Sequence, residues 1–216
     1  MARKRPTTRT QPVPATTLRI IGGRLRGSRL TYNGDPATRP MKERVREATF
    51  NLVGPAVKDK HAVDLFAGTG ALGLEALSRG AAHSTFIERH RPTAKTLREN
   101  IVALGMEDRS HIVTSDTFFW AGGLPEVLRA EIASGSNVHA GEPPWLVFCS
   151  PPYALYHEQT DEMLALIETL LKHAPTESLV VVEADSAFDF AKLPEASTWD
   201  VRAYHPAVIG IWPRGK

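Results

Sequence analysis

The 216-residue sequence predicts an α/β fold, in which a largely parallel β-sheet carries helices on both faces. From residue 61 onward, short apolar runs typical of buried strands alternate with amphipathic segments of helical length. Units of this kind, each roughly 20–30 residues long, form parallel sheets. The last two apolar runs are separated only by Pro206, which favours an antiparallel pairing at the end of the sheet.

The expected elements begin with an N-terminal extension. Residues 18–32 contain short β-like runs interrupted by glycines, which predicts a small hairpin. Residues 41–54 repeat apolar side chains every three or four positions, which predicts a helix. The sheet strands are expected at 62–66, 84–88, 111–116, 145–149, 179–185, 199–205 and 207–212. Further helices are expected at 71–80, 92–104, 123–135 and 157–173.

Composition divides the chain into a disordered basic arm (1–17), the hairpin and helix extension (18–57) and a sheet domain (58–216). Residues 1–47 hold 12 Lys and Arg against three acids, whereas the remainder has a net charge of −7. A basic segment attached to an acidic body is typical of proteins that bind polyanions. For residues 1–17 alone, a solubilising tail is the simpler interpretation.

Several classes of protein are not expected. No apolar run approaches the ~20 residues of a membrane span. The one cysteine, Cys149, excludes an internal disulfide, and no Cys/His cluster has the spacing of a zinc site. We therefore expect no metal. The chain begins without the apolar core of a signal peptide, so we expect a cytoplasmic protein.

The segment VDLFAGTGALG places Gly68, Gly70 and Gly73 as GxGxxG between a predicted strand and a predicted helix. Such glycines allow a sharp turn and a close approach of the backbone to a ligand near the helix N-terminus. The motif alone is equally compatible with a nicotinamide dinucleotide site, and a purely structural turn is a less favoured alternative.

Three carboxylates lie at or near the predicted carboxyl ends of consecutive strands: Asp64, Glu88 and Asp116. This edge is where open parallel sheets bind ligands. Glu88 stands 20 residues after Gly68, where an acid accepts both ribose hydroxyls, and Asp116 is placed to meet a purine amine. A phosphate-rich cofactor would favour positive charge here, so the acids favour the cationic S-adenosylmethionine over NAD. A nicotinamide dehydrogenase stays a remote alternative.

The fourth strand, WLVFC, runs into Ser150-Pro151-Pro152-Tyr153. Together with DLFAGTGALGLEALSRGA and the final reversed hairpin, this corner resembles class I S-adenosylmethionine-dependent methyltransferases. The subgroup with [DNS]PP[YF] methylates exocyclic amines. The blocks RIIGGRLRG and TRPMKERVREATFNLVG are similar to the RsmD family of small-subunit (16S) rRNA guanine-N2 methyltransferases. The resemblance implies a Rossmann-like sheet of seven strands, the last one antiparallel.

The resemblance also implies roles for the matching residues. The methionine end of the cofactor would be lined by Asp64, Phe66, Gly68, Thr69 and Gly70. Glu88 would hold the ribose and Asp116 the adenine amine.

At the corner, the Ser150 hydroxyl and the Pro151 carbonyl would accept hydrogen bonds from the target amine. The prolines, Pro152 included, fix the elbow and offer no competing N–H. Tyr153 would stack on the base, which must be extruded or already unpaired.

Ser150 departs from the family, whose members usually carry Asp or Asn at this position. A hydroxyl still accepts a hydrogen bond, but more weakly than a carboxylate. Serine here is seen in cytosine-N4 DNA methyltransferases, so methylation of DNA or of another RNA amine is one alternative. A weakly active RNA-binding assembly factor is another, and a purely structural proline turn is a minor alternative that the nearby glycine loop disfavours.

The basic residues expected to contact RNA fall on the hairpin, the following loop and the start of the first helix: Arg24, Arg26, Arg29, Arg39, Lys42, Arg44 and Arg46. Arginine binds phosphate in a bidentate manner and stacks on bases. Arg44 and Arg46 have a structural alternative, in which they pair with Glu43 or Glu47 or cover the cofactor pocket. The expected partner is rRNA, either free or in a partly assembled small subunit, and the protein is expected to be a monomer.

Overall fold

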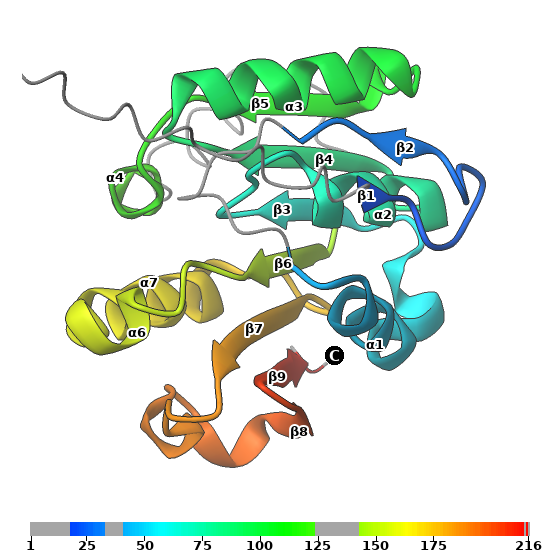
Figure 1. Cartoon of the computed structure of the whole chain (residues 1–216). Helices are drawn as coiled ribbons and strands as arrows, with labels where there is room; N and C mark the ends of the chain where they lie inside the picture. The colour runs from blue at the N-terminus through cyan, green and yellow to red at the C-terminus, as the bar shows by residue number, and fades with distance from the viewer. Residues whose placement is uncertain (1–17, 33–40, 124–142, 214, 216) are drawn as a thin grey trace, which may run out of the picture.

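The protein forms one seven-stranded sheet and a separate two-stranded hairpin (Figure 1). The computed structural model describes residues 18–32, 41–123, 143–213 and 215. The hairpin strands are β1 (Leu18–Arg19) and β2 (Arg29–Leu30). The sheet strands are β3 (His61–Asp64), β4 (His83–Ile87), β5 (Ser110–Val113), β6 (Trp145–Cys149), β7 (Leu179–Asp185), β8 (Asp200–Tyr204) and β9 (Ala207–Pro213).

Strand order in the sheet is β5-β4-β3-β6-β7-β9-β8. The first five strands in this order pair in parallel, and β9 runs antiparallel to both of its neighbours. These pairings confirm the predicted α/β class, the seven strands and the reversed final strand. The order changes direction between β3 and β6, so the loops after these two strands leave the same edge side by side, at the position where such sheets bind ligands.

Helices cover both faces of the sheet. They are α1 (Glu43–Val53), α2 (Ala71–Arg79), α3 (Arg91–Ala103), α4 (Thr117–Gly122), α6 (Leu155–Glu158) and α7 (Thr160–His173). Short 3₁₀ turns occupy η1 (Gly54–Val57), η2 (Glu107–Arg109), η3 (Phe190–Lys192) and η4 (Ala196–Thr198).

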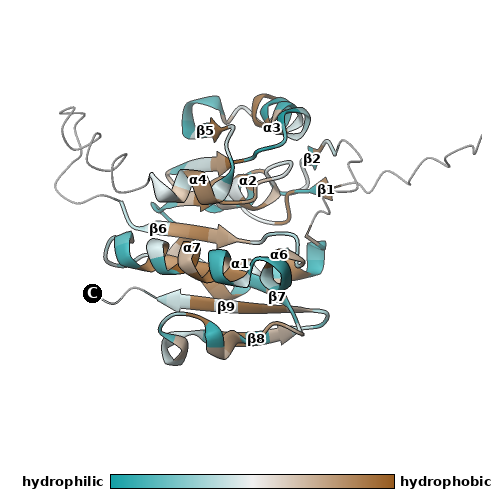
Figure 2. Cartoon of the chain, turned by 90° about the vertical axis from the view of Figure 1, so that its left-hand side faces the viewer, coloured by the Kyte–Doolittle hydropathy of each residue, from teal (hydrophilic) through white to brown (hydrophobic). Residues whose placement is uncertain are grey.

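Alternate residues of each central strand belong to different apolar clusters, as the period of two in a strand requires. One cluster joins the sheet to α4, α6 and α7, and the others join it to α1, α2, α3 and the hairpin. In Figure 2, β6 and β9 are hydrophobic along most of their length, whereas α1 shows hydrophilic residues. Burial on both faces explains why these strands are nearly continuous apolar runs.

Several boundaries differ from the sequence prediction by one to three residues, and two of the differences have a clear structural cause. The third sheet strand ends at Val113 rather than residue 116, because Asp116 caps α4, a short helix that the sequence analysis did not anticipate. The long helix expected at 157–173 is interrupted at Gln159, whose φ of −134° and ψ of 47° separate α6 from α7. The helix expected at 123–135 falls, apart from its first residue, outside the described residues, and so does the arm 1–17.

The confirmed N-terminal hairpin packs directly on α2. The backbone N–H of Arg24 donates to the Ser78 carbonyl at 2.8 Å, and that of Leu25 donates to the Ser78 hydroxyl at 2.9 Å. A Cβ at Gly23 would lie 2.0 Å from the Ser78 carbonyl oxygen, so only glycine allows this approach. The extension is therefore held against the sheet domain by backbone contacts as well as by apolar packing.

Candidate active site

The glycine loop connects β3 to α2 at the edge of the sheet. Gly68 and Gly70 both have positive φ, 54° and 87°, a conformation that glycine adopts without strain. A Cβ at Gly70 would lie 2.3 Å from a methyl carbon of Leu97, and one at Gly73 would lie 2.3 Å from the Phe86 ring. Gly73 is thus required by close packing, and Gly68 and Gly70 by their backbone conformation. The buried Thr69 lies between Gly68 and Gly70.

Asp64 ends β3 beneath this loop and is only 2% exposed. Its carboxylate accepts a hydrogen bond from the Gly73 N–H at 3.1 Å, within the first turn of α2. Burial raises the pKa of Asp64 to about 7, although the bond from Gly73 lowers it, and the charge of Glu88 raises it further. In this structure Asp64 therefore contacts the backbone of the first turn of α2, directly after the glycine loop, which is compatible with its predicted place at the methionine end of a cofactor.

Glu88 follows β4 and reaches across to the glycine loop. One carboxylate oxygen accepts from the Gly68 N–H at 2.9 Å, and the other accepts from the His90 N–H at 2.7 Å. Burial raises the pKa of Glu88, and the two backbone hydrogen bonds oppose that shift. Each carboxylate oxygen retains a second lone pair, so the predicted contact with ribose hydroxyls stays chemically open.

Asp116 lies beyond the end of β5 and caps α4. Its carboxylate accepts from the Phe118 N–H at 3.0 Å and lies 3.4 Å from the Arg89 guanidinium. Phe66, predicted to line the cofactor, makes an edge contact with the Phe118 ring, with centroids 6.4 Å apart. Neighbouring Phe119 is 82% exposed, the most exposed large apolar side chain among the described residues.

The proline corner leaves β6 next to the glycine loop. Asp64 of β3 stands in register with Phe148 of β6, and the Leu65 N–H donates to the Phe148 carbonyl at 3.1 Å. Since neighbouring strands lie ~4.8 Å apart, the two loops begin side by side at one level. Pro151 is buried in this corner and Pro152 is exposed.

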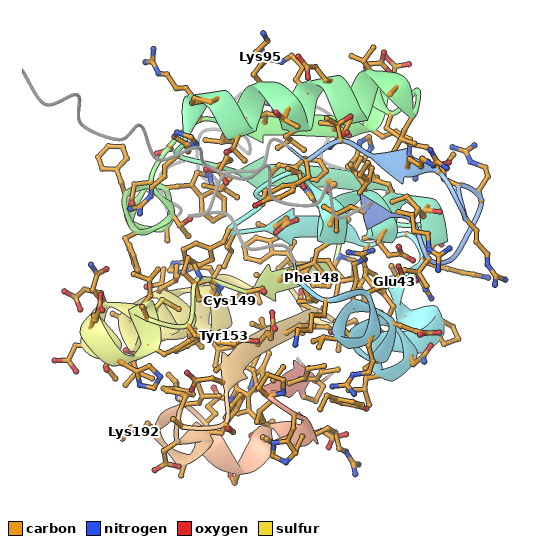
Figure 3. The ribbon with its side chains drawn as sticks, in the orientation of Figure 1. Glu43, Lys95, Phe148, Cys149, Tyr153 and Lys192 are labelled. Carbon is orange, nitrogen blue, oxygen red and sulfur yellow. The ribbon has the colours of Figure 1, made fainter. Side chains whose placement is uncertain are left out.

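Two side chains of the corner bind a carboxylate that the sequence analysis missed. The Ser150 hydroxyl donates to one oxygen of Glu183, and the Tyr153 hydroxyl donates to the other at 2.6 Å. Glu183 lies in β7 and is 5% exposed. Figure 3 places Tyr153 beside β7, together with Phe148 and Cys149 at the end of β6. The available signal was an acid, Glu183, inside the apolar strand LVVVEAD, two residues before the acid that ends the strand.

The single cysteine takes no visible part in this chemistry. Cys149 is fully buried directly before Ser150, and its sulfur lies 3.7 Å from the Tyr156 hydroxyl. Burial raises the pKa of the thiol to about 12, so the reactive thiolate is disfavoured.

Most of the predicted RNA-contacting residues are exposed, but Arg46 is not. The exposed ones are Arg24, Arg26, Arg29, Lys42 and Arg44, whereas Arg39 lies outside the described residues. Arg46 is fully buried, donates to the Arg19 carbonyl at 2.6 Å and lies 3.9 Å from the Glu75 carboxylate. Its assignment to RNA binding is therefore corrected. Burial lowers the pKa of Arg46, and Glu75 opposes that shift.

The structural alternative for Arg44 and Arg46 is also revised. Arg44 donates to the His205 carbonyl at 2.5 Å, and Glu43 pairs with Arg19 at 2.7 Å.

Within the described ranges, no cluster of three or more His, Cys, Asp or Glu side chains is arranged to hold a metal ion. No described helix is long and apolar enough to cross a membrane.

Comparison with known proteins agrees with this geometry. Ribosomal RNA small subunit methyltransferase D of Escherichia coli K12 is 38% identical over 136 residues, which cover 63% of this chain and 60% of the relative. Putative rRNA methyltransferase YlbH of Bacillus subtilis is 35% identical over 99 residues, which cover 46% of this chain and 54% of the relative. The alignments thus span less than two thirds of these curated relatives.

Solved structures match over a longer range. A putative methyltransferase, yhhF, from Escherichia coli superposes with a TM-score of 0.70 at 28% identity, covering 92% of this chain and 98% of that one. An RNA methyltransferase from Salinibacter ruber, solved with S-adenosyl-L-homocysteine, gives a TM-score of 0.56 at 17% identity over 82% of this chain and 95% of that one, and supports the fold alone. The family model described as Conserved hypothetical protein 95 matches residues 18–205, from the hairpin to the end of β8. The chain therefore belongs to this family, the RsmD family, and has a class I methyltransferase fold.

Proposed function

We propose that the protein transfers a methyl group from S-adenosylmethionine to an exocyclic amine of small-subunit rRNA in the cytoplasm, with guanine N2 as the target. One observation carries the proposal. A glycine loop and a Ser-Pro-Pro-Tyr corner leave adjacent parallel strands at the same level. A donor held at the first and a base held at the second would meet between them. The names of the curated relatives support rRNA as the substrate.

The loop residues fit the proposed cofactor. S-adenosylmethionine, when bound, supplies a methyl group activated by a positively charged sulfur. Asp64 and Glu88 place two carboxylates beneath and beside the glycine loop, and both have raised pKa values because they are buried. A positive ligand would stabilise their charged forms, whereas a phosphate would be repelled. The chemistry of this donor set therefore favours a cation.

The corner residues fit the proposed target. A guanine amine is a poor nucleophile because its lone pair is delocalised into the ring. The Ser150 hydroxyl and the Pro151 carbonyl would accept its two N–H bonds and favour a more tetrahedral nitrogen. The Tyr153 hydroxyl is held by Glu183 at 2.6 Å, which fixes the ring that would stack on the base. Orientation of this kind contributes up to ~7–11 kcal/mol to catalysis, so no metal is needed in this scheme.

The exposed arginines of the hairpin support an RNA substrate. Arg24, Arg26 and Arg29 lie on the extension that packs against α2, and their side chains are exposed. Phosphate binding by such residues is independent of sequence and positions the RNA. The choice of base would then depend on the corner.

The test is to incubate the protein with rRNA, with partly assembled small subunits and with DNA in the presence of labelled S-adenosylmethionine. Modified nucleosides are then identified by mass spectrometry. We expect N2-methylguanosine in rRNA, and comparison of free rRNA with particles identifies the better substrate. Label that enters only cytosine or adenine of DNA would overturn the proposal in favour of the second candidate, a DNA amino-methyltransferase, which Ser150 at the corner favours.

A further inference from the structure

Ser150 stands at the position that receives the target amine, and its own proton already has an acceptor in the structure. The hydroxyl donates to Glu183, which comes from the next strand of the sheet. Cys149 of β6 stands in register with Val182 of β7, so Ser150 and Glu183 occupy adjacent positions just beyond. Both carboxylate oxygens are used, since Tyr153 binds the second.

We propose that Glu183 positions the Ser150 hydroxyl and takes up, through it, the proton that the target amine loses during methyl transfer. The inference rests on the proposed function. It explains how a serine, which accepts hydrogen bonds more weakly than a carboxylate, can serve at this corner. The carboxylate is present, but it acts from one strand away.

The hydrogen bond determines how the hydroxyl can be used. A serine hydroxyl has one hydrogen to donate and two lone pairs to accept with. Because Glu183 takes the hydrogen, the lone pairs of Ser150 stay available for the N–H of the target. Without Glu183 the hydroxyl would rotate, and its hydrogen would compete for the lone pair of the amine.

The step balances as follows. The amine nitrogen uses its lone pair to form a bond to the methyl carbon, while the bond from that carbon to sulfur breaks and its electron pair stays on sulfur. The nitrogen now carries one proton too many and gives it to the Ser150 oxygen. Ser150 simultaneously passes its own proton to Glu183, which ends neutral and returns the proton to water when the site opens.

The surroundings of Glu183 suit a proton acceptor. Burial raises its pKa, and the hydrogen bonds from Ser150 and Tyr153 lower it. A carboxylate with a raised pKa takes up a proton more readily near neutral pH. In the described part of the chain, the titratable groups that influence it are Tyr153 and Tyr156, while its partner in β9 is the apolar Ile209. No described cation is paired with it.

The decisive measurement is a double-mutant cycle on methyl transfer with the variants Ser150→Ala, Glu183→Gln and both together. We expect Glu183→Gln to lower kcat about 10²-fold with little change in KM, a typical loss for a positioned proton acceptor. In the Ser150→Ala background, Glu183→Gln should have an effect at least about tenfold smaller, because the two groups act as one unit. Losses that simply multiply would overturn the proposal.

The pH dependence separates a proton-transfer role from a structural one. The wild-type kcat should fall toward acidic pH as Glu183 becomes protonated, and both single variants should lose that acidic limb. Persistence of the limb in the variants would contradict the proposal. If Glu183→Gln does not fold, the profile of Ser150→Ala decides in the same way.

Binding measurements complete the experiment. The dissociation constants for S-adenosylhomocysteine and for RNA should stay within about twofold in Glu183→Gln, since neither contact is removed. The matched control is Glu195→Gln, which alters a carboxylate bonded to Trp212 at 2.9 Å and should leave kcat unchanged. Absence of methylation by the wild-type protein on any rRNA substrate would instead defeat the proposed function, so the two failures are distinguishable.

Discussion

Glu75 holds the N-terminal extension against the sheet domain, and we expect Glu75→Gln to destabilise the protein strongly. Its buried carboxylate accepts the backbone N–H groups of Ile21 and Gly22, each at 2.7 Å. It also accepts from Arg79 at 2.7 Å and lies 3.9 Å from the Nε of fully buried Arg46. A glutamine would present an NH₂ group to donors and leave the Arg46 charge uncompensated.

The magnitude follows from these contacts. Removing one partner of a buried ion pair costs about 3–5 kcal/mol. Unfolding free energies are only about 5–15 kcal/mol, so the variant should lose a large part of its stability. Arg46 Nε and Nη1 already find no hydrogen-bond partner among the described residues, which leaves little to replace Glu75.

Urea unfolding monitored by circular dichroism measures this loss as a change in midpoint at constant slope. The control is Glu99→Gln, because Glu99 is 56% exposed and pairs with Lys95 only at 3.9 Å. Exposed pairs contribute about 0–1 kcal/mol, so this variant should unfold close to the wild type.

A second variant tests whether the Glu75 charge organises this network. Arg46→Met added to Glu75→Gln removes the unpaired charge and should recover part of the stability, since buried ion pairs are often replaceable by apolar side chains. A loss below about 1 kcal/mol for Glu75→Gln, or no recovery in the double variant, would refute a network organised around the Glu75 charge.

Three further changes have defined outcomes. Gly70→Ala should lower the free energy of unfolding by about 1–3 kcal/mol and weaken binding of S-adenosylhomocysteine in calorimetry. Gly122→Ala, which has open space at its Cβ, should show neither effect. Asp64→Asn should remove a pH dependence of stability: because the folded pKa of Asp64 is raised to about 7, the stability of the wild type relative to the variant should fall as pH rises from about 4 to 7, which unfolding at several pH values would show. Arg26→Ala should weaken RNA binding and reduce its salt slope by about 1, whereas Arg46→Met should leave the slope unchanged.

The fold was predictable because local pattern and global topology agree. The apolar strands, the GxGxxG turn and the reversed final pair each indicate the same parallel sheet, and helices on both faces follow from strands that are apolar throughout. The prediction is wrong where two local structures compete for the same residue. Asp116 was expected to continue a strand but instead caps α4, because a carboxylate can accept two helical N–H groups there.

The candidate site was predictable where its residues belong to a motif or, like Glu88, end a predicted strand. Gly68, Gly70 and the proline corner are contiguous in sequence, so their pattern is visible. Glu183 binds Tyr153 from 30 positions away, and Glu75 binds the backbone of Ile21 from 54 positions away, and the sequence contains no spacing that connects either pair. Contacts between distant residues also explain why Arg46 was wrongly assigned to RNA binding. Whether an arginine on a helix is exposed or buried depends on which other segments pack over it, and the helix sequence does not show this.

Each of the two loops of the site is held by a carboxylate from a neighbouring strand. The site therefore includes residues that lie outside the two sequence motifs. The loop after β3 is bound by Glu88 from the neighbouring strand β4, and the corner after β6 is bound by Glu183 from the neighbouring strand β7. Loops at the carboxyl edge of a parallel sheet contain donors that the strand ladders cannot satisfy. A carboxylate from the next strand toward the edge of the sheet accepts hydrogen bonds from these donors. Each loop is thereby fixed relative to the sheet. The distance between a bound donor and a bound base would then be set by the spacing of β3 and β6, which are hydrogen-bonded neighbours in the sheet.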